Sequence, residues 1–250
     1  MEVEGILGLV IVLGSALLML VLSFRKIQQI LPFDLRSIPA FKRLQRAVGL
    51  AVEDGKRQHV ALGSANILDP SSASALVGLS ALENITRLSM ASDRPPVATS
   101  GDPVLSILSQ DTMRAVYREG NAIDQYPFYN GRLVGVSPSS YIAGVLPTAY
   151  DEQVSTHLVI GNFGPEIALL SDAAERQNAF LMASSDSLPA QAVLYASAQE
   201  PLIGEELFAV PAHLKGNAMH RGSLHTQDVL RWVLAAGLLV GSILKLAGVI

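Results

Sequence analysis

The chain has 250 residues, a formal net charge of -4 and no cysteine. The missing cysteines exclude disulfides, thiolate metal ligands and a cysteine nucleophile, and the negative charge gives no reason to expect nucleic acid as a partner. Half of the residues are hydrophobic and only 16% are charged, which excludes a disordered polymer and predicts a folded core.

The first predicted element is an apolar run from Gly5 to Phe24, in which only Ser15 and Ser23 are polar. A helix of this length crosses the ~30 Å hydrocarbon core of a bilayer. An apolar region of about 20 residues is too long for an ordinary signal peptide, and no small-residue cleavage site follows it. We therefore expect residues 1–24 to form an uncleaved transmembrane helix.

Residues 25–57 are expected to form a basic, amphipathic arm beside the membrane. Apolar positions between residues 37 and 54 recur every three or four residues, as on a helix with one apolar face. Two contacts are open for that face, the lipid surface and the soluble domain. The basic residues favour an anionic leaflet, and their position after the first span predicts that this side is cytoplasmic. The expected anchoring residues of the arm are Arg25, Lys26, Lys42, Arg43 and Arg46.

Residues 58–214 predict an α/β domain, Rossmann-like, with a mainly parallel sheet and flanking helices. Short apolar runs alternate with segments of helical periodicity, which is typical of βα units. Asp69-Pro70 and Asp102-Pro103 each predict an N-cap followed by proline at the first helical position. Asn130-Gly131 predicts a turn. Strands are expected at 59–63, 97–99, 133–136, 156–161 and 180–183, and residues 201–214 are expected to be helical.

Residues 215–228 are expected to be a linker, and residues 229–250 a second transmembrane helix with Trp232 at the interface. The domain is therefore bracketed by N- and C-terminal transmembrane helices, with both termini outside. Gly237 and Gly241 form a Gly-x-x-x-Gly pair that permits close helix packing. The pair could join the two spans of one chain, which we favour slightly, or join protomers.

Polar residues follow several of the predicted strands, where an open parallel sheet binds its ligands and where helix N-termini favour anions. The same residue types are good helix caps, so a purely structural role is the favoured interpretation. The candidate ligand-binding residues are Ser100, Gly101, Asp102, Asn162, Gly164, Glu166, Ser184 and Asp186.

No motif in the sequence identifies a reaction. The phosphate loop, the nucleophile elbow and the zinc-binding helix motif are all absent. Gly161 and Gly164 match only half of a dinucleotide fingerprint, and the histidines are too scattered for a zinc pattern. His157 lies in the strongest strand and is expected to be a core histidine. We therefore assign no catalytic residue, no metal and no cofactor.

Three stretches, 51–57, 92–102 and 198–208, resemble a bacterial membrane-protein family catalogued only as a domain of unknown function. They read AVEDGKR, SDRPPVATSGD and AQEPLIGEELF. The likeness covers nearly the whole chain and implies an integral architecture of two terminal spans around an α/β domain. It brings no activity, cofactor or catalytic residue.

We expect a membrane-anchored, non-catalytic binding or scaffolding protein of the bacterial plasma membrane. Its expected partners are the lipid bilayer, further copies of itself and other membrane proteins. Two alternatives stay open. One is a small-ligand sensor or metal-assisted enzyme that uses Asp102, Glu166 and Asp186, and the other is an accessory subunit of a membrane transport complex.

Overall fold

The computed structural model describes residues 3–24, 35–216 and 218–246. The chain divides into two compact units. One comprises residues 38–214, and the other combines both ends of the chain, residues 1–37 and 215–250. The predicted anchoring residues Arg25 and Lys26 lie outside the described residues.

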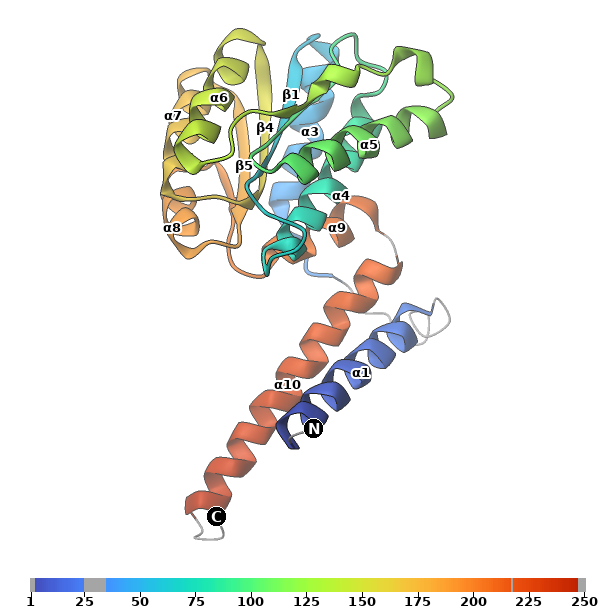
Figure 1. The fold of residues 1–250 in the computed structure, drawn as a ribbon, viewed down its shortest axis with the longest axis vertical. Coiled ribbons are helices and arrows are strands. Elements are labelled where there is room, and N and C mark those ends of the chain that lie inside the picture. Colours follow the sequence, from blue (N-terminus) through green and yellow to red (C-terminus); the bar gives the residue numbers. More distant parts are fainter. Residues whose placement is uncertain (1–2, 25–34, 217, 247–250) are drawn as a thin grey trace. The chain divides into compact units, whose positions relative to one another are not determined.

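In the terminal unit, helices α1 (Val3–Ser23) and α10 (Ala218–Leu246) lie side by side (Figure 1). The two helices approach closely at Gly222 on α10, where an added Cβ would lie 3.0 Å from the backbone nitrogen and Cα of Ser23. Nothing lies within 4 Å of a Cβ added at Gly237 or Gly241. The close packing between the two helices therefore uses Gly222, and the Gly-x-x-x-Gly pair is left open.

Within the described ranges, α10 is the one helix long and apolar enough to cross a membrane, and α1 contributes a shorter apolar stretch, Gly8–Ser23. α10 begins at Ala218, so most of the predicted linker is helical. Trp232 is 76% exposed on α10, and the large aliphatic residues near it are similarly exposed. The length and the apolar composition of α10 would allow it to cross a membrane.

Six strands of the described chain form one parallel sheet in the order β3-β2-β1-β4-β5-β6. This confirms the predicted α/β class. The central strands are almost fully buried, as expected for a parallel sheet covered on both faces. The strands are β1 (Arg57–Gly63), β2 (Val97–Ser100), β3 (Gly131–Leu133), β4 (Val154–Asn162), β5 (Phe180–Ser185) and β6 (Glu200–Leu202).

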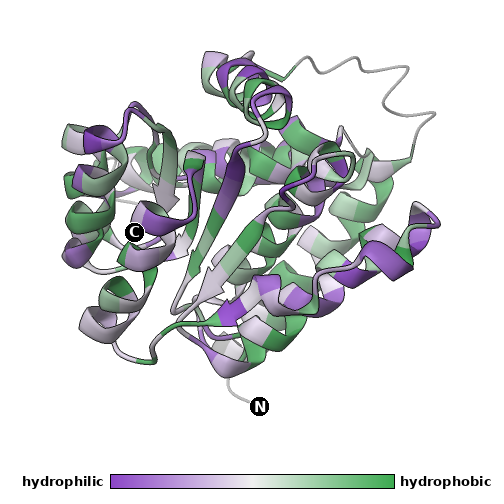
Figure 2. Ribbon diagram, turned by 90° about the horizontal axis from the view of Figure 1, so that it is seen from above, coloured by the Kyte–Doolittle hydropathy of each residue, from purple (hydrophilic) through white to green (hydrophobic). Residues whose placement is uncertain are grey.

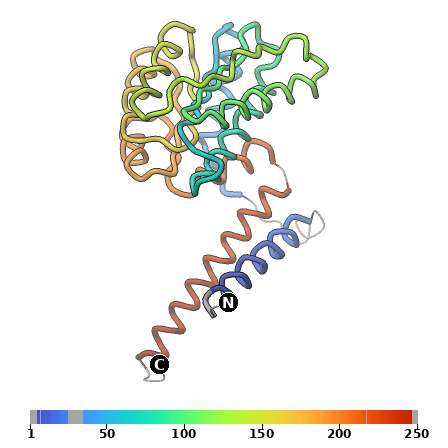
Figure 3. Tube along the Cα trace, viewed as in Figure 1, coloured from blue at the N-terminus to red at the C-terminus, as the bar shows by residue number. Residues whose placement is uncertain are grey.

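Helices cover both faces of the sheet. One face packs against α3 (Pro39–Glu53), α4 (Ser72–Ser89), α5 (Pro103–Glu119) and α9 (Glu206–Lys215). The other packs against α6 (Pro138–Asp151), α7 (Ala168–Arg176) and α8 (Leu188–Ser197). Figure 2 shows hydrophobic residues concentrated in the strands and on the helix faces that cover them. In Figure 3 the teal and green trace of α4 and α5 lies on one side of the sheet, and the yellow and orange trace of α7 and α8 on the other.

The structure settles the contact of the amphipathic arm. The apolar face of α3, including Phe41, Leu44 and Val48, is buried in the core of the 38–214 unit. The unit therefore starts at Ile38 instead of the predicted residue 58. Lys42, Arg43 and Arg46 are exposed on the outer side of α3, and Arg43 forms an ion pair with Glu200 on β6.

Several predicted elements are shifted. Asn130-Gly131 makes no hairpin turn, because Gly131 starts β3, which pairs in parallel with β2. The strand expected at 133–136 lies two residues earlier. The helix expected after Asp69-Pro70 begins at Ser72. Residues 200–202, expected to be partly helical, form the edge strand β6, where a proline is tolerated.

Candidate functional site

The strand order reverses between β1 and β4. These strands are neighbours in the sheet although 90 residues lie between the end of β1 and the start of β4. Gly63 at the end of β1 pairs with Asn162 at the end of β4. From here the chain crosses to the helices of one face after β1 and to those of the other face after β4. In open parallel sheets such a reversal is where ligands bind, beyond the carboxyl ends of the strands.

The predicted candidate residues all lie at this carboxyl edge, after three different strands. Ser100, Gly101 and Asp102 stand at the end of β2, and Asn162, Gly164 and Glu166 at the end of β4. Ser184 and Asp186 stand at the end of β5. The sequence therefore places the polar edge correctly, and the hydrogen bonds decide what each side chain does there.

Asp102 ends a loop and starts a helix. One carboxylate oxygen accepts a hydrogen bond of 2.8 Å from the backbone N–H of Leu105, so Asp102 is the N-cap of α5, as predicted. The other oxygen accepts a hydrogen bond of 3.3 Å from the side-chain amide of Asn66, in the loop after β1. Asp102 is only 9% exposed. Its carboxylate joins the loops after β1 and β2.

Asp186 joins three further segments. Its carboxylate accepts a hydrogen bond of 2.7 Å from the amide of Asn162 at the end of β4. It accepts a second, also 2.7 Å, from the hydroxyl of Ser74 on the first turn of α4. Ser74 is fully buried. The two interactions hold the loops after β4 and β5 against α4.

Glu166 and Ser184 act locally. The Glu166 carboxylate accepts a hydrogen bond of 2.9 Å from the backbone N–H of Gly164, two residues earlier. The Ser184 hydroxyl is buried and donates to the carbonyl of Leu202 on β6. Among the residues that the structure describes, no three histidine or carboxylate side chains are close enough together to hold a metal ion. Asp102, Glu166 and Asp186 therefore do not form such a group.

The backbones of β1 and β4 approach unusually closely at Gly63. Gly63 has a φ of +69°, and the pairing of the two strands shifts at this point. A Cβ added here would collide with the carbonyl oxygen of Asn162. Glycine is therefore required both by conformation and by space, and it fixes the geometry of the edge where the strand order reverses.

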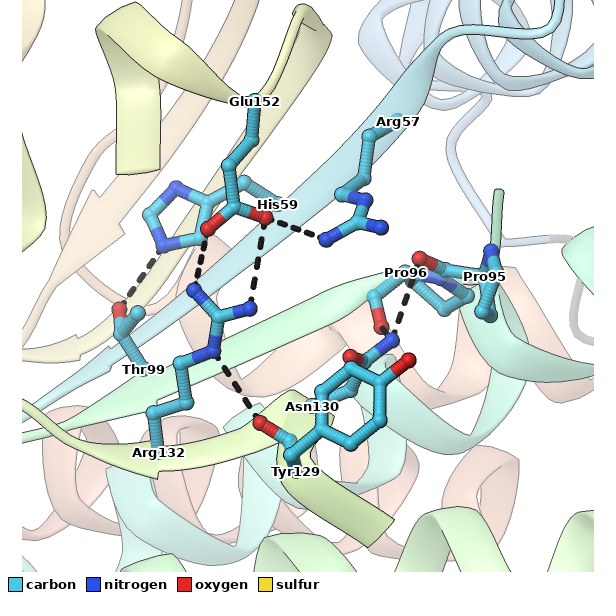
Figure 4. Close-up of polar contacts among 9 residues, drawn as sticks. All are labelled: Arg57, His59, Pro95, Pro96, Thr99, Tyr129, Asn130, Arg132 and Glu152. Carbon is cyan, nitrogen blue, oxygen red and sulfur yellow. Dashed lines mark hydrogen bonds and ion pairs between the residues drawn. The ribbon is translucent and has the colours of Figure 1, made fainter. Parts of the chain in front are cut away.

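A chain of buried polar groups crosses the sheet beneath this edge. His59 on β1 and His157 on β4 face each other, with 3.0 Å between their Nδ1 atoms. The Nε2 of His59 lies 2.8 Å from the hydroxyl of Thr99, which lies 3.1 Å from the hydroxyl of Tyr141 on α6. Figure 4 shows the His59–Thr99 contact. The expectation that His157 is a core histidine is confirmed, and its Nε2 is buried with no hydrogen-bond partner among the residues that the structure describes.

Burial controls the titration of this chain. It lowers the pKa of His157 to about 4, because the charged form loses its hydration. Burial also lowers the pKa of His59, with further lowering by His157 and Arg132. Both imidazoles are neutral at pH 7. Burial raises the pKa of Tyr141, so its hydroxyl keeps its proton.

A second polar cluster lies beside the first. The carboxylate of Glu152, just after α6, forms ion pairs with Arg57 on β1 and Arg132 on β3 (Figure 4). Arg132 also donates from Nε to the carbonyl of Tyr129 at 3.1 Å. The buried amide of Asn130 donates to the carbonyl of Pro96 at 3.0 Å, which holds the segment before β2. These side chains fix the strands β1, β2 and β3 relative to α6.

Neither cluster could be predicted from the sequence. A histidine in an apolar strand predicts burial without naming its partner, and 98 residues separate His59 from His157. Glu152 and its two arginines come from three segments that lie far apart in the sequence, and no pattern in any one segment indicates its partners. Only the pairing of the strands brings these groups together.

A family model described as a domain of unknown function, DUF6754, matches residues 2–250. No curated protein and no solved structure matches the chain. Because the family model spans nearly all of the chain, this protein belongs to the DUF6754 family.

Proposed function

We propose that this protein is a membrane-anchored, non-catalytic binding or scaffolding protein. The observation that carries the proposal is the state of the carboxylates at the carboxyl edge of the sheet. Asp102 accepts one hydrogen bond from the first turn of its own helix and one from the loop after β1. Asp186 accepts hydrogen bonds from β4 and α4, and Glu166 accepts one from the backbone of Gly164. These hydrogen bonds hold loops and helix starts in place, so a structural role accounts for the three carboxylates at this edge without a substrate or a metal ion.

The proposed location is the bacterial plasma membrane, with α1 and α10 as two spans, both termini outside and the 38–214 unit in the cytoplasm. The long apolar helix α10 and the apolar stretch of α1 support the anchoring. The excess of Lys and Arg after the first span supports the orientation.

The test is a thermal-shift measurement on the full chain in mild detergent, with nucleotides, sugars and divalent cations as additives. Asp102→Asn, Glu166→Gln and Asp186→Asn are compared with the parent. We expect the variants to lower the melting temperature, the Asp186 variant most, and no additive to stabilise the parent. The proposal fails if Asp102→Asn and Glu166→Gln keep the parental melting temperature but abolish stabilisation by one of the additives.

The second candidate is a small-ligand sensor, and it is favoured by one observation. The order β3-β2-β1-β4-β5-β6 places the loops with Ser64, Asn66 and Asn162 around the point where the strand order reverses. Stabilisation of the parent by one additive, lost on Asn66→Ala but kept on the distant Asn178→Ala, would favour the sensor over the scaffold.

A further inference from the structure

The outer side of α5 and the segment 121–133 form a groove that no function above uses. The groove has a volume of about 470 Å³ and is lined by Ile107, Gln110, Asp111, Arg114, Ile123, Tyr126 and Phe128. We call this surface the α5 groove. It lies at the β3 end of the sheet, where α5 is labelled in Figure 1.

The apolar side chains of the α5 groove are exposed to an unusual degree. Ile107 is 66% exposed and Phe128 is 73% exposed. Tyr129, whose ring contacts that of Phe128, is 60% exposed. Adjacent large exposed side chains of this kind mark an interaction surface, because single exposed apolar residues are usually scattered.

The charges in the α5 groove are of opposite sign. Asp111 and Arg114 are both exposed and lie one turn apart on α5. Neither forms an ion pair with any residue in the described part of the chain. A surface with one unpaired acid and one unpaired base is complementary to itself about a two-fold axis that passes between the two residues, since each acid then faces the base of the other copy.

The edge strand β3 is poorly suited to pair with a strand of another molecule. The side-chain amide of Gln110 donates a 2.7 Å hydrogen bond to the carbonyl of Gly131 on the edge strand β3. This occupies one of the few backbone acceptors on a strand of three residues. We therefore expect a partner to contact the side chains of α5 and of the aromatic pair Phe128 and Tyr129.

We propose that two copies of this protein associate through the α5 groove about a two-fold axis. Asp111 of each copy then pairs with Arg114 of its partner, and the exposed apolar side chains around Ile107 and Phe128 are covered. The inference rests on the proposed scaffolding function and gives it a partner. Anchoring in a membrane would concentrate the copies in one plane, so an interface of moderate area suffices.

The experiment compares charge-reversed variants of the full chain in mild detergent by mass measurement at micromolar concentration. Asp111→Arg and Arg114→Asp each place like charges opposite one another, so each alone should weaken the dimer at least tenfold. The double variant, and an equimolar mixture of the two single variants, should regain the parental dimer. The control is Asp172→Arg on α7, on the other face of the sheet, which should leave the dimer unchanged.

A second readout uses the absence of cysteine from the chain. With a bifunctional thiol reagent, Ile107→Cys should cross-link to its partner, whereas the similarly exposed Leu169→Cys on α7 should not. A parent that is monomeric, or a single reversal that remains dimeric, overturns the proposal. The proposal is also overturned if the parent is monomeric and a different protein binds to the α5 groove. Extraction of the parent from membranes by alkaline carbonate would refute anchoring without bearing on the dimer in detergent.

Discussion

The ring of Phe41 stacks on the ring of His213, with 4.6 Å between the ring centroids and 9° between the planes. Phe41 lies on the first helix of the 38–214 unit and His213 on its last, so the stack joins the points where the chain enters and leaves this unit. The side-chain amide of Asn84 on α4 also holds the end of α9, because it donates a 3.2 Å hydrogen bond to the carbonyl of Leu214. These contacts therefore hold the first and last helices of the 38–214 unit together.

Replacing Phe41 by alanine should destabilise the 38–214 unit by about 3 kcal/mol, because a buried aromatic ring is lost from the core. Phe41 is only 4% exposed. Urea unfolding followed by circular dichroism measures the change. Leu50→Ala on the exposed side of the same helix should change stability by no more than about 0.5 kcal/mol. Equal effects of the two variants would show that the α3 face does not carry the stability assigned to it.

Acid should destabilise the fold through the two buried histidines. The folded-state pKa of His157 is about 4, below its ordinary value of 6.5, so only the unfolded chain binds this proton between those two pH values. Stability is therefore complete above pH 6.5 and falls as the pH drops toward 4. His157 alone should cost about 2 kcal/mol between pH 7.5 and pH 5.

The measurement is the urea midpoint as a function of pH, and the control is His157→Leu. This variant should be less stable at pH 7.5, because Nδ1 of His59 loses its partner, but its stability should fall less steeply with acid. A slope identical to that of the parent would mean that His157 does not titrate as its burial requires.

Glu152→Gln should destabilise the protein by about 1–3 kcal/mol, because it leaves the half-buried cations Arg57 and Arg132 without their shared counter-charge. The matched control is Asp172→Asn, which breaks an exposed pair with Arg176 and should change stability by less than about 0.5 kcal/mol. Thermal unfolding at low and high salt measures both. If Glu152→Gln were as mild as the control, the cluster would not hold β1, β3 and α6 together.

Gly63→Ala should be far more damaging than Gly55→Ala. Both glycines have left-handed backbones, with φ values of +69° and +63°. Gly55 has nothing within 4 Å of an added Cβ, so its substitution should cost about 1 kcal/mol of conformational strain. At Gly63 the added Cβ also meets the carbonyl of Asn162, and we expect at least about 3 kcal/mol. Similar unfolding midpoints for the two variants would contradict the close approach of β1 and β4.

The proposed orientation predicts the labelling of single cysteines in this cysteine-free chain. In intact cells a membrane-impermeant maleimide should modify Val3→Cys and spare Gln125→Cys, which is exposed on the 38–214 unit. Both positions should react after the cells are broken. Labelling of position 125 and protection of position 3 in intact cells would invert the orientation.

Local features of the fold were predictable because they depend on neighbours in sequence. The alternation of apolar runs with helical periodicity predicts parallel βα units, and Asp102-Pro103 predicts the start of α5 at the correct residue. The strand β6 was not predicted, because its three residues, one of them proline, are too few to show a periodic pattern. The amphipathic pattern of α3 predicts a buried face without saying what buries it, and only the structure identifies the core of the sheet as its contact.

The candidate site divides in the same way. Its residues were predictable, because polar groups at the ends of apolar strands must lie at one edge of a parallel sheet. Their roles were not, since Asn66 meets Asp102 across 36 residues and Asn162 meets Asp186 across 24. The sequence by itself determined most of the elements, the apolar terminal helix and the location of the polar edge. The tertiary structure decided the strand order and the partner of every buried polar group, because a hydrogen bond depends on distance in space and periodicity reports only which face is buried.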